Sequence, residues 1–210
     1  VSLLPLWDLL HPGFPITHDG QDHVARIANF YQSLSEGNIV PRWAANLNWG
    51  YGHPILMFLY PLPSYIASLF HVIGFSFVDS TKLVFAVSYI ASIAAMYVWI
   101  SAAWGSLAAV TAAILYGFAP YRFVDLYVRG AIGEHVAFIF PPLICWGLLR
   151  LARERTPQTV SLMMVTIGTA LLILSHNALS LVFLPIIALY GVYLAVQETR
   201  EKSRFVVFGS

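Results

Sequence analysis

The chain has 210 residues, of which 59% are hydrophobic and 10% charged, and its formal net charge is +1. A soluble domain carries about 25% charged residues, so this composition, with a mean hydropathy of +0.73, excludes an ordinary soluble domain. The near-neutral charge excludes a basic nucleic-acid-binding surface, and Cys145, as the one cysteine, excludes an intrachain disulfide. Long apolar runs predict an all-α, polytopic transmembrane helical bundle.

The whole chain, 1–210, is expected to form a single transmembrane module and to be a fragment truncated at both ends. Residues 1–12 are apolar and predict the end of a first transmembrane helix. An outer loop with interfacial or embedded helices is expected over 16–80, and transmembrane helices over 82–196. Another apolar run opens at Phe205, so 205–210 predict the start of a further membrane helix.

A first polar cluster, Thr17–His23, follows the helix-terminating run Pro12-Gly13-Phe14-Pro15. From Asp22 onward, apolar residues recur with helical period and predict an amphipathic helix at the membrane interface, ending near Gly37. These residues are Val24, Ile27, Phe30, Tyr31 and Leu34. The tryptophans and tyrosines that follow, over 43–51, are typical of a membrane–water boundary.

The next apolar run, 54–77, contains Pro61 and Pro63, each of which removes a helical hydrogen bond. We expect a broken, partly embedded element on the outer side of the membrane. The alternative is a full crossing, which would place the arginines of 150–155 outside and violate the positive-inside rule.

Five spans are expected after it. They are 82–102, 106–121, 135–151, 159–175 and 178–196, the last two separated by a tight turn at His176-Asn177. Six of the 11 Lys and Arg residues fall in two short segments, which predicts that both are cytoplasmic. They are Arg150, Arg153, Arg155, Arg200, Lys202 and Arg204. Counting helices then places His176 and the segment 120–134 outside.

Polar residues of three segments should therefore meet on the outer face. They are Asp19, Asp22 and His23 from the first segment, Arg122, Asp125, Arg129, Glu134 and His135 from the second, and His176 from the third. Ionisable groups at membrane depth are costly unless they serve a site, although Asp125 is equally explained as a partner of one of the two arginines. A carboxylate supplies a general base, arginines recognise phosphate, and carboxylates with histidine bind a divalent metal. All three indicate chemistry on a phosphate-activated lipid.

Four stretches carry a resemblance to a known family. "EGNIVPRW", "GYGHP" with "YPLPSY", "LYGFAPYRFVDLYVRGAIGEHVAFIFPPLI" and "LILSHNALSLVFLP" resemble the multi-pass glycosyltransferases of the GT-C superfamily. The chain is similar to bacterial membrane proteins often described as 6-pyruvoyl-tetrahydropterin-synthase-related. The resemblance extends over nearly all of the chain.

The resemblance implies transfer of a sugar from a polyprenyl-phosphate-linked donor to an acceptor, with inversion, on the outer face of a bacterial cytoplasmic membrane. It assigns the catalytic carboxylate to Asp19, with Asp22 as the competing assignment. A divalent metal, Mg or Mn, would be held by Asp19, Asp125 and Glu134. However, the adjacent acidic pair found in some branches is absent, which leaves metal dependence open.

We therefore expect Asp19 to orient or deprotonate the acceptor. Arg122, Arg129, Glu134, His176 and His23 would contact the substrate and its phosphate. A transporter or flippase of a lipid-linked or polar substrate would explain the same intramembrane charges through alternating access. A non-catalytic polysaccharide-assembly subunit is a third interpretation. Convergence of Asp19, Glu134 and His176 on one outward-facing cavity would favour the enzyme.

Overall fold

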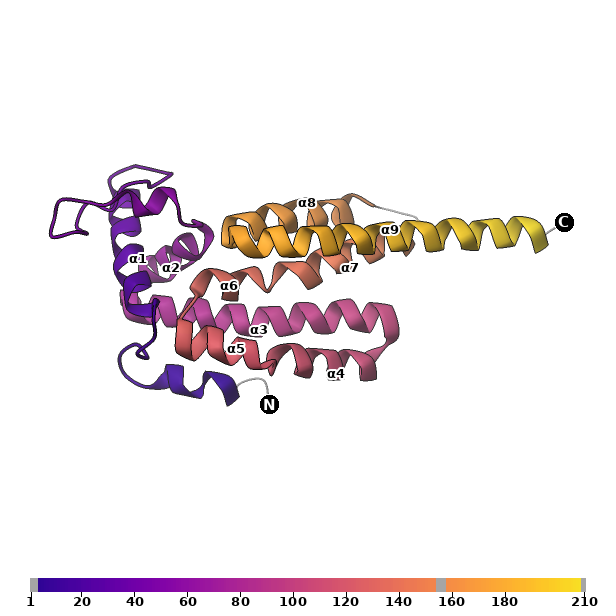
Figure 1. The fold of residues 1–210 in the computed structure, drawn as a ribbon, viewed down its shortest axis with the longest axis horizontal. Helices are drawn as coiled ribbons and strands as arrows, with labels where there is room; N and C mark the ends of the chain where they lie inside the picture. Colours follow the sequence, from indigo (N-terminus) through magenta and orange to yellow (C-terminus); the bar gives the residue numbers. More distant parts are fainter. Residues whose placement is uncertain (1–3, 154–157, 209–210) are drawn as a thin grey trace.

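The computed structural model describes residues 4–153 and 158–208, in which every regular element is helical, as the sequence predicted. The elements are η1 (Leu4–Leu10), α1 (Gly20–Ser35), η2 (Pro54–Met57), α2 (Leu62–Val72), α3 (Phe77–Trp104), α4 (Ser106–Gly117), α5 (Pro120–Phe123), η3 (Val124–Arg129), α6 (Ile132–Ala137), α7 (Phe140–Arg153), α8 (Gln158–Ser175) and α9 (Asn177–Phe208). The long helices lie along one axis, and α1 and α2 lie across one end of them (Figure 1).

The bundle is built around α3 and α7. Helix α3 packs against α4 and α7, and α7 in turn packs against α8 and α9. Their shared core contains Phe85, Tyr89, Ile144 and Leu172, all of them buried. Among the described residues, four helices are long and apolar enough to cross a membrane, or up to five if a bent pair forms one span. The chain is therefore an integral, multi-pass membrane protein.

Helix α3 contains the predicted span 82–102 and is longer at both ends. It begins where the Ser76 hydroxyl accepts a hydrogen bond from the Asp79 backbone N–H, and it ends at Gly105, whose φ is 88°. Its 28 residues extend about 42 Å, more than the roughly 30 Å of a hydrocarbon core.

The predicted span 106–121 is bent, because Pro120 cannot continue α4 and instead begins α5. Helix α4 and the segment Pro120–Arg129 meet at 44°. The segment 120–134, which the helix count placed outside, is helical except at Gly130 and Ala131, with π-helical geometry in η3. Within this segment, Arg122 and Asp125 find partners inside the bundle, in Ser92 and His135.

The proline-containing run 54–77 is broken, as predicted. It forms η2 and α2, and Pro61 stands immediately before α2. The 11 residues of α2 extend about 16 Å, too short for a crossing. Helix α2 packs on α1 and α3, so this region closes one end of the bundle.

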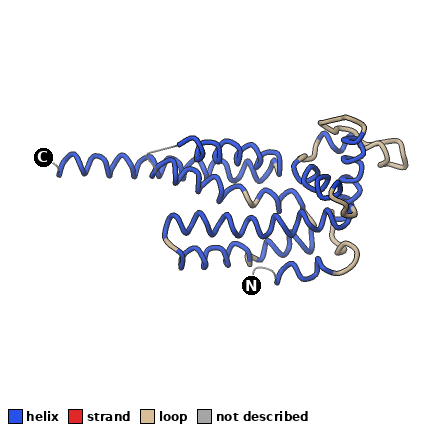
Figure 2. Tube along the Cα trace, turned by 180° about the vertical axis from the view of Figure 1, so that it is seen from behind, coloured by secondary structure: helices blue, strands red, loops and turns tan. Residues whose placement is uncertain are grey.

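The first helix expected, over 1–12, is described as the short 3-10 helix η1 lying against α3. The amphipathic helix is confirmed as α1, which begins at Gly20, two residues before the predicted start. It buries Ile27 and Phe30 and exposes Asp22. Loops gather at this end of the molecule (Figure 2).

The predicted hairpin at His176 is confirmed, since α8 ends at Ser175 and α9 begins at Asn177. Helix α9 passes through Arg200, Lys202 and Arg204, whose side chains lie outside the described part. Residues 205–208 continue α9 rather than begin a new helix, because the charged run does not interrupt the helical backbone.

The two ends of the bundle differ in the way that the charge pattern predicted. Arg153 donates to the Ala102 carbonyl at 2.7 Å, beside the end of α3. The His176 turn lies at the opposite end, where α1 and α2 cross the bundle (Figure 1). Arg155 lies outside the described residues. The assignment of one end to the cytoplasm stays a prediction.

Candidate functional site

A turn between η3 and α6 brings Arg129 and Glu134 face to face. Gly130 in this turn has a left-handed backbone (φ 67°), which glycine adopts without steric cost. The Ala131 backbone N–H donates to the Asp125 carbonyl at 3.1 Å and closes the end of η3. Across the turn, Arg129 Nη2 lies 2.6 Å from Glu134 Oε1. Single π-helical segments such as η3 occur frequently at functional sites.

Both oxygens of Glu134 are engaged. The Tyr121 hydroxyl donates to Glu134 Oε2 at 2.5 Å, and Arg129 Nη1 donates to the same hydroxyl at 2.6 Å. The Glu134 side chain is 5% exposed, whereas that of Arg129 is 37% exposed. The carboxylate is therefore enclosed, while the guanidinium reaches the surface with its counter-ion fixed behind it.

His176 joins this group from the α8–α9 turn. Its Nε2 lies 3.8 Å from Glu134 Oε1, and its Nδ1 accepts a hydrogen bond from the Leu179 backbone N–H at 3.2 Å. Burial lowers the pKa of His176, against the opposing effect of Glu134, which favours the neutral ring. Because Nδ1 is the acceptor, the neutral ring carries its proton on Nε2, facing the carboxylate.

Tyr60 covers His176, with the two ring centroids 4.8 Å apart. A methyl group on Gly133 would lie 2.0 Å from Tyr60 Cε2, so only glycine lets the phenol rest on α6. Burial raises the pKa of Tyr60 to about 12, and the carboxylates of Glu134 and Asp19 act in the same direction. The phenol therefore stays protonated at neutral pH.

The segment before α1 is fastened to the end of η3. The backbone N–H groups of His18 and Asp19 donate to the carbonyls of Val128 and Arg129, each at 2.9 Å. A methyl group on Gly130 would lie 2.4 Å from Thr17 Oγ1. Asp19 stands at the N-cap of α1 but makes no side-chain capping bond. Its half-buried carboxylate is thus held at the same end of the molecule as Arg129 and Glu134 and is not used by the helix.

Arg122, expected to contact phosphate, lies in the interior. It is 3% exposed, its Nη2 donates to the Ser92 hydroxyl at 3.0 Å, and its guanidinium lies 4.5 Å from the Phe138 ring centroid. The rings of Tyr89 and Tyr116 flank it. Aromatic rings stabilise the buried cation through their faces, so Arg122 is a core residue and is not presented to a ligand at this end.

Asp125 is also in the interior. Its side chain and that of His135 are both fully buried, with Asp125 Oδ2 2.8 Å from His135 Nδ1. Asp125 Oδ1 lies 3.5 Å from Arg129 Nη1, and this contact links the buried Asp125–His135 pair to the Arg129–Glu134 pair. The interpretation of Asp125 as a partner of an arginine therefore describes its contacts better than that of a surface metal ligand.

The other predicted residues of the first segment point elsewhere. Asp22 is exposed and pairs with Arg26 at 3.2 Å. Asp22 lies in the first turn of α1, whose N-cap is Asp19. His23 is buried, and burial lowers its pKa to about 4. His23 is therefore a neutral, buried side chain of α1 and is not available to a phosphate.

The structure also tests whether the predicted metal ligands fit a divalent ion. Among the side chains that the structure describes, in 4–153 and 158–197, no three His, Cys, Asp or Glu residues are grouped so that they could hold one. Glu134 is already paired with Arg129, and Asp125 is already bonded to His135. These residues do not fit a metal site, and we derive no step through a metal.

Sequence reasoning missed Tyr60, Tyr121 and Thr17 because it followed charge, and these side chains are neutral. A usable signal was present in the sequence. Tyr60 precedes a proline-rich turn, and Tyr121 stands beside Arg122 at the start of a helix. Polar aromatic residues at helix starts deserve inclusion among candidate site residues when a bundle carries few charges.

Comparison with known proteins finds a distant bacterial relative. The chain is 23% identical over 216 residues to an uncharacterized protein of Lactococcus lactis subsp. cremoris (strain MG1363). The aligned region covers 100% of this chain and 34% of that protein. The chain therefore spans about a third of the length of this relative. No family model and no solved structure matches this chain.

Proposed function

We propose that the chain is part of a membrane glycosyltransferase, which moves a sugar from a polyprenyl-phosphate-linked donor to an acceptor at the outer face. The observation that carries the proposal is the convergence of three distant segments at one end of the bundle. Arg129 pairs with Glu134, Glu134 faces His176, and Asp19 is joined through its backbone to Arg129. The backbone of Asp19, whose carboxylate has no capping role, is thus held next to that of Arg129, the cation that would recognise the phosphate.

The roles follow from exposure and protonation. Arg129 is the cation at the surface, and charge-assisted hydrogen bonds from a guanidinium suit a phosphate. Asp19 takes the proton of the acceptor hydroxyl as its oxygen attacks the anomeric carbon. The bond from that carbon to the phosphate oxygen breaks, and Arg129 stabilises the negative charge of the departing lipid phosphate. The neutral Nε2–H of His176 and the Tyr60 phenol are hydrogen-bond donors for the sugar.

The test uses the full-length protein in liposomes with a polyprenyl-phosphate-linked sugar. Asp19→Asn keeps the shape of the residue and removes its charge, so transfer should fall about 10²–10⁴-fold. Asp22→Asn is the matched control, because Asp22 is exposed and pairs with Arg26, and its transfer rate should stay near normal. A dead Asp22→Asn beside an active Asp19→Asn would exchange their roles. Normal transfer by both would remove this loop from the reaction.

A second function, transport of a lipid-linked or polar substrate, is favoured by the fully buried pair Asp125–His135 inside the bundle. Intramembrane ionisable groups also mark proton and substrate pathways. Flux of a lipid-linked sugar across a protein-containing bilayer, abolished by Asp125→Asn but unchanged by Asp19→Asn, would favour this function over transfer.

A further inference from the structure

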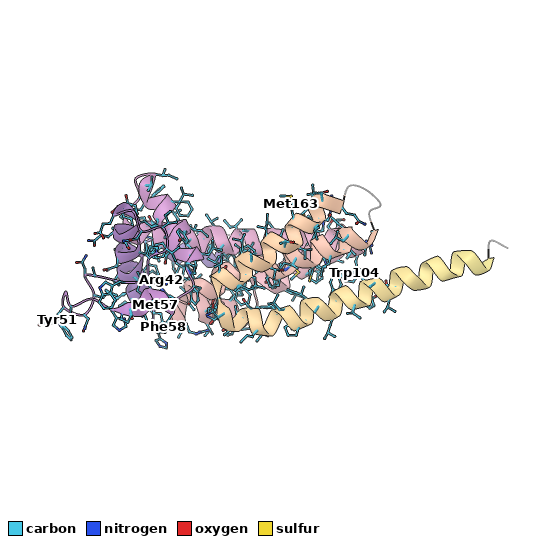
Figure 3. All side chains as sticks on the ribbon, turned by 90° about the horizontal axis from the view of Figure 1, so that it is seen from above. Arg42, Tyr51, Met57, Phe58, Trp104 and Met163 are labelled. Atoms are coloured by element: carbon cyan, nitrogen blue, oxygen red, sulfur yellow. The ribbon has the colours of Figure 1, made fainter. Side chains whose placement is uncertain are left out.

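Three exposed aromatic side chains lie within residues 43–51, in the loop between α1 and α2, and we call them the aromatic tip. They are Trp43, Trp49 and Tyr51, with exposed fractions of 52%, 93% and 83%. Figure 3 places Tyr51 at the extreme end of the molecule. Aromatic surface of this kind, gathered in one place, marks an interaction site.

The aromatic tip is held rigidly. An antiparallel bridge closes its base, with the Ala44 and His53 backbones donating to each other at 2.9 and 3.0 Å. Inside the bridge, the Gly52 backbone N–H donates to the Leu47 carbonyl at 3.0 Å. The Asn46 backbone N–H donates to Asn29 Oδ1 on α1 at 2.8 Å. The rings are therefore presented on a scaffold anchored to the bundle end.

The backbone of the tip is strained in order to present Trp49. Asn48 and Trp49 have φ values of 56° and 55°, and the left-handed region is unfavourable for a bulky residue. A methyl group on Gly52 would lie 2.4 Å from Trp43 Nε1, so glycine lets that indole lie on the tip's backbone. Strain of this kind is found where a side chain has to be held for a ligand.

The chemistry and position of the tip select among ligands. The sequence from Trp43 to His53 contains no Asp, Glu, Lys or Arg, so the tip offers nothing to match a charged partner. The loop lies on the side of α1 that faces away from the bundle and its long helices (Figure 1). Flat indole and phenol faces beside amide groups match the apolar CH face and hydroxyl groups of a pyranose ring.

We propose that the aromatic tip is a binding site for a neutral saccharide chain in the water outside the bundle. Trp49 and Tyr51 would stack on sugar rings, and Trp43 would extend the same surface. The assignment of this chain as the acceptor rests on the proposed function, whereas the binding site itself does not. The tip would hold the acceptor chain at the end of the molecule where Asp19 lies.

The experiment measures calorimetric binding of neutral, soluble hexasaccharides built from glucose, from mannose and from N-acetylglucosamine to the full-length protein in nanodiscs. At least one chain should bind, and Trp49→Ala and Tyr51→Ala should each weaken it at least about tenfold. Trp104→Ala is the matched control. Its side chain is 65% exposed and lies at the bundle's other end (Figure 3), so binding should be unchanged.

Three results would overturn the proposal. They are no binding of any of the three chains, full binding by both tip variants, and quenching of Trp49 fluorescence by brominated lipids, which would place the tip in the bilayer. Loss of saccharide binding in Trp49→Ala, together with unchanged transfer in Asp19→Asn, would keep the binding site and reject the proposed reaction. The two proposals therefore fail separately.

Discussion

Two carboxylate–histidine pairs lie side by side in this molecule, and they differ in access to the surface. Asp125 and His135 are fully buried between α3 and the η3–α6 segment. Glu134 and His176 stand at the bundle end, and their partner Arg129 is 37% exposed. Glu134 and His135 are neighbours in sequence, yet a helical step of about 100° turns Glu134 toward Arg129 and His176 and turns His135 toward Asp125. The same residue types therefore serve a core and a candidate site.

This difference shows that the charged residues of one membrane-helix motif have to be assigned individually, either to the core or to a candidate site. Buried ionisable groups are retained where they have partners, as Asp125 Oδ2 has in His135. A group that binds a ligand instead pairs with one buried partner and remains partly exposed to solvent, as Arg129 does. On this criterion, Arg122 and Asp125 belong to the core, and Arg129 belongs to the site.

The strongest test of this division is stability. Asp125→Ala would leave the buried His135 ring without its hydrogen-bond partner, and a buried polar group left unsatisfied costs about 1–3 kcal/mol. Glu134→Ala leaves Arg129, which water can reach, so its cost should be nearer 1 kcal/mol. Thermal unfolding of both variants in the same detergent measures the difference. Equal losses would show that the two groups are one structural unit.

The second test is phosphate affinity, with farnesyl phosphate as the probe and farnesol as its uncharged control. A hydrogen bond to a charged group is worth about 1.5–3 kcal/mol, so Arg129→Gln should weaken farnesyl phosphate binding roughly ten- to a hundredfold. Arg153→Gln, at the other end of the bundle, is the matched control and should bind normally. Weaker binding of farnesol as well would mean that the variant has lost its fold rather than a phosphate contact.

The same residues show which features of the structure the sequence could predict. The helices, the break at Pro61 and the hairpin at His176 followed from hydropathy and proline, because these act locally. The helical course of 120–134 did not, since it depends on the partners that Arg122 and Asp125 find on other elements. Likewise, charge selected Arg129, Glu134 and His176 as site candidates, but Tyr60 is visible only through its contact with His176.

The third test breaks the docking of Asp19 on the site. Gly130→Ala forces a side chain into a left-handed backbone, which costs about 1–2 kcal/mol, and drives its methyl group against Thr17. Gly37→Ala is the matched control, because Gly37 also has a positive φ (93°) but nothing within 4 Å of an added methyl group. Hydrogen exchange at the His18 and Asp19 amides should accelerate only in Gly130→Ala. Acceleration in both variants would attribute the change to general instability.

The last and smallest effect is the titration of His176, followed by NMR of its ring. Burial lowers its pKa below the ordinary value of 6.5, Glu134 raises it and Arg129 lowers it. Glu134→Gln should therefore move the midpoint further down, and Arg129→Gln should move it up. A histidine with a lowered folded pKa contributes stability that is complete above the unfolded pKa and is lost as pH falls towards the folded one. His176→Asn should accordingly flatten the fall in stability below pH 6.5. Shifts of the same sign in the two charge variants would mean that His176 does not sense the Arg129–Glu134 pair. His176 would then no longer belong to the candidate site.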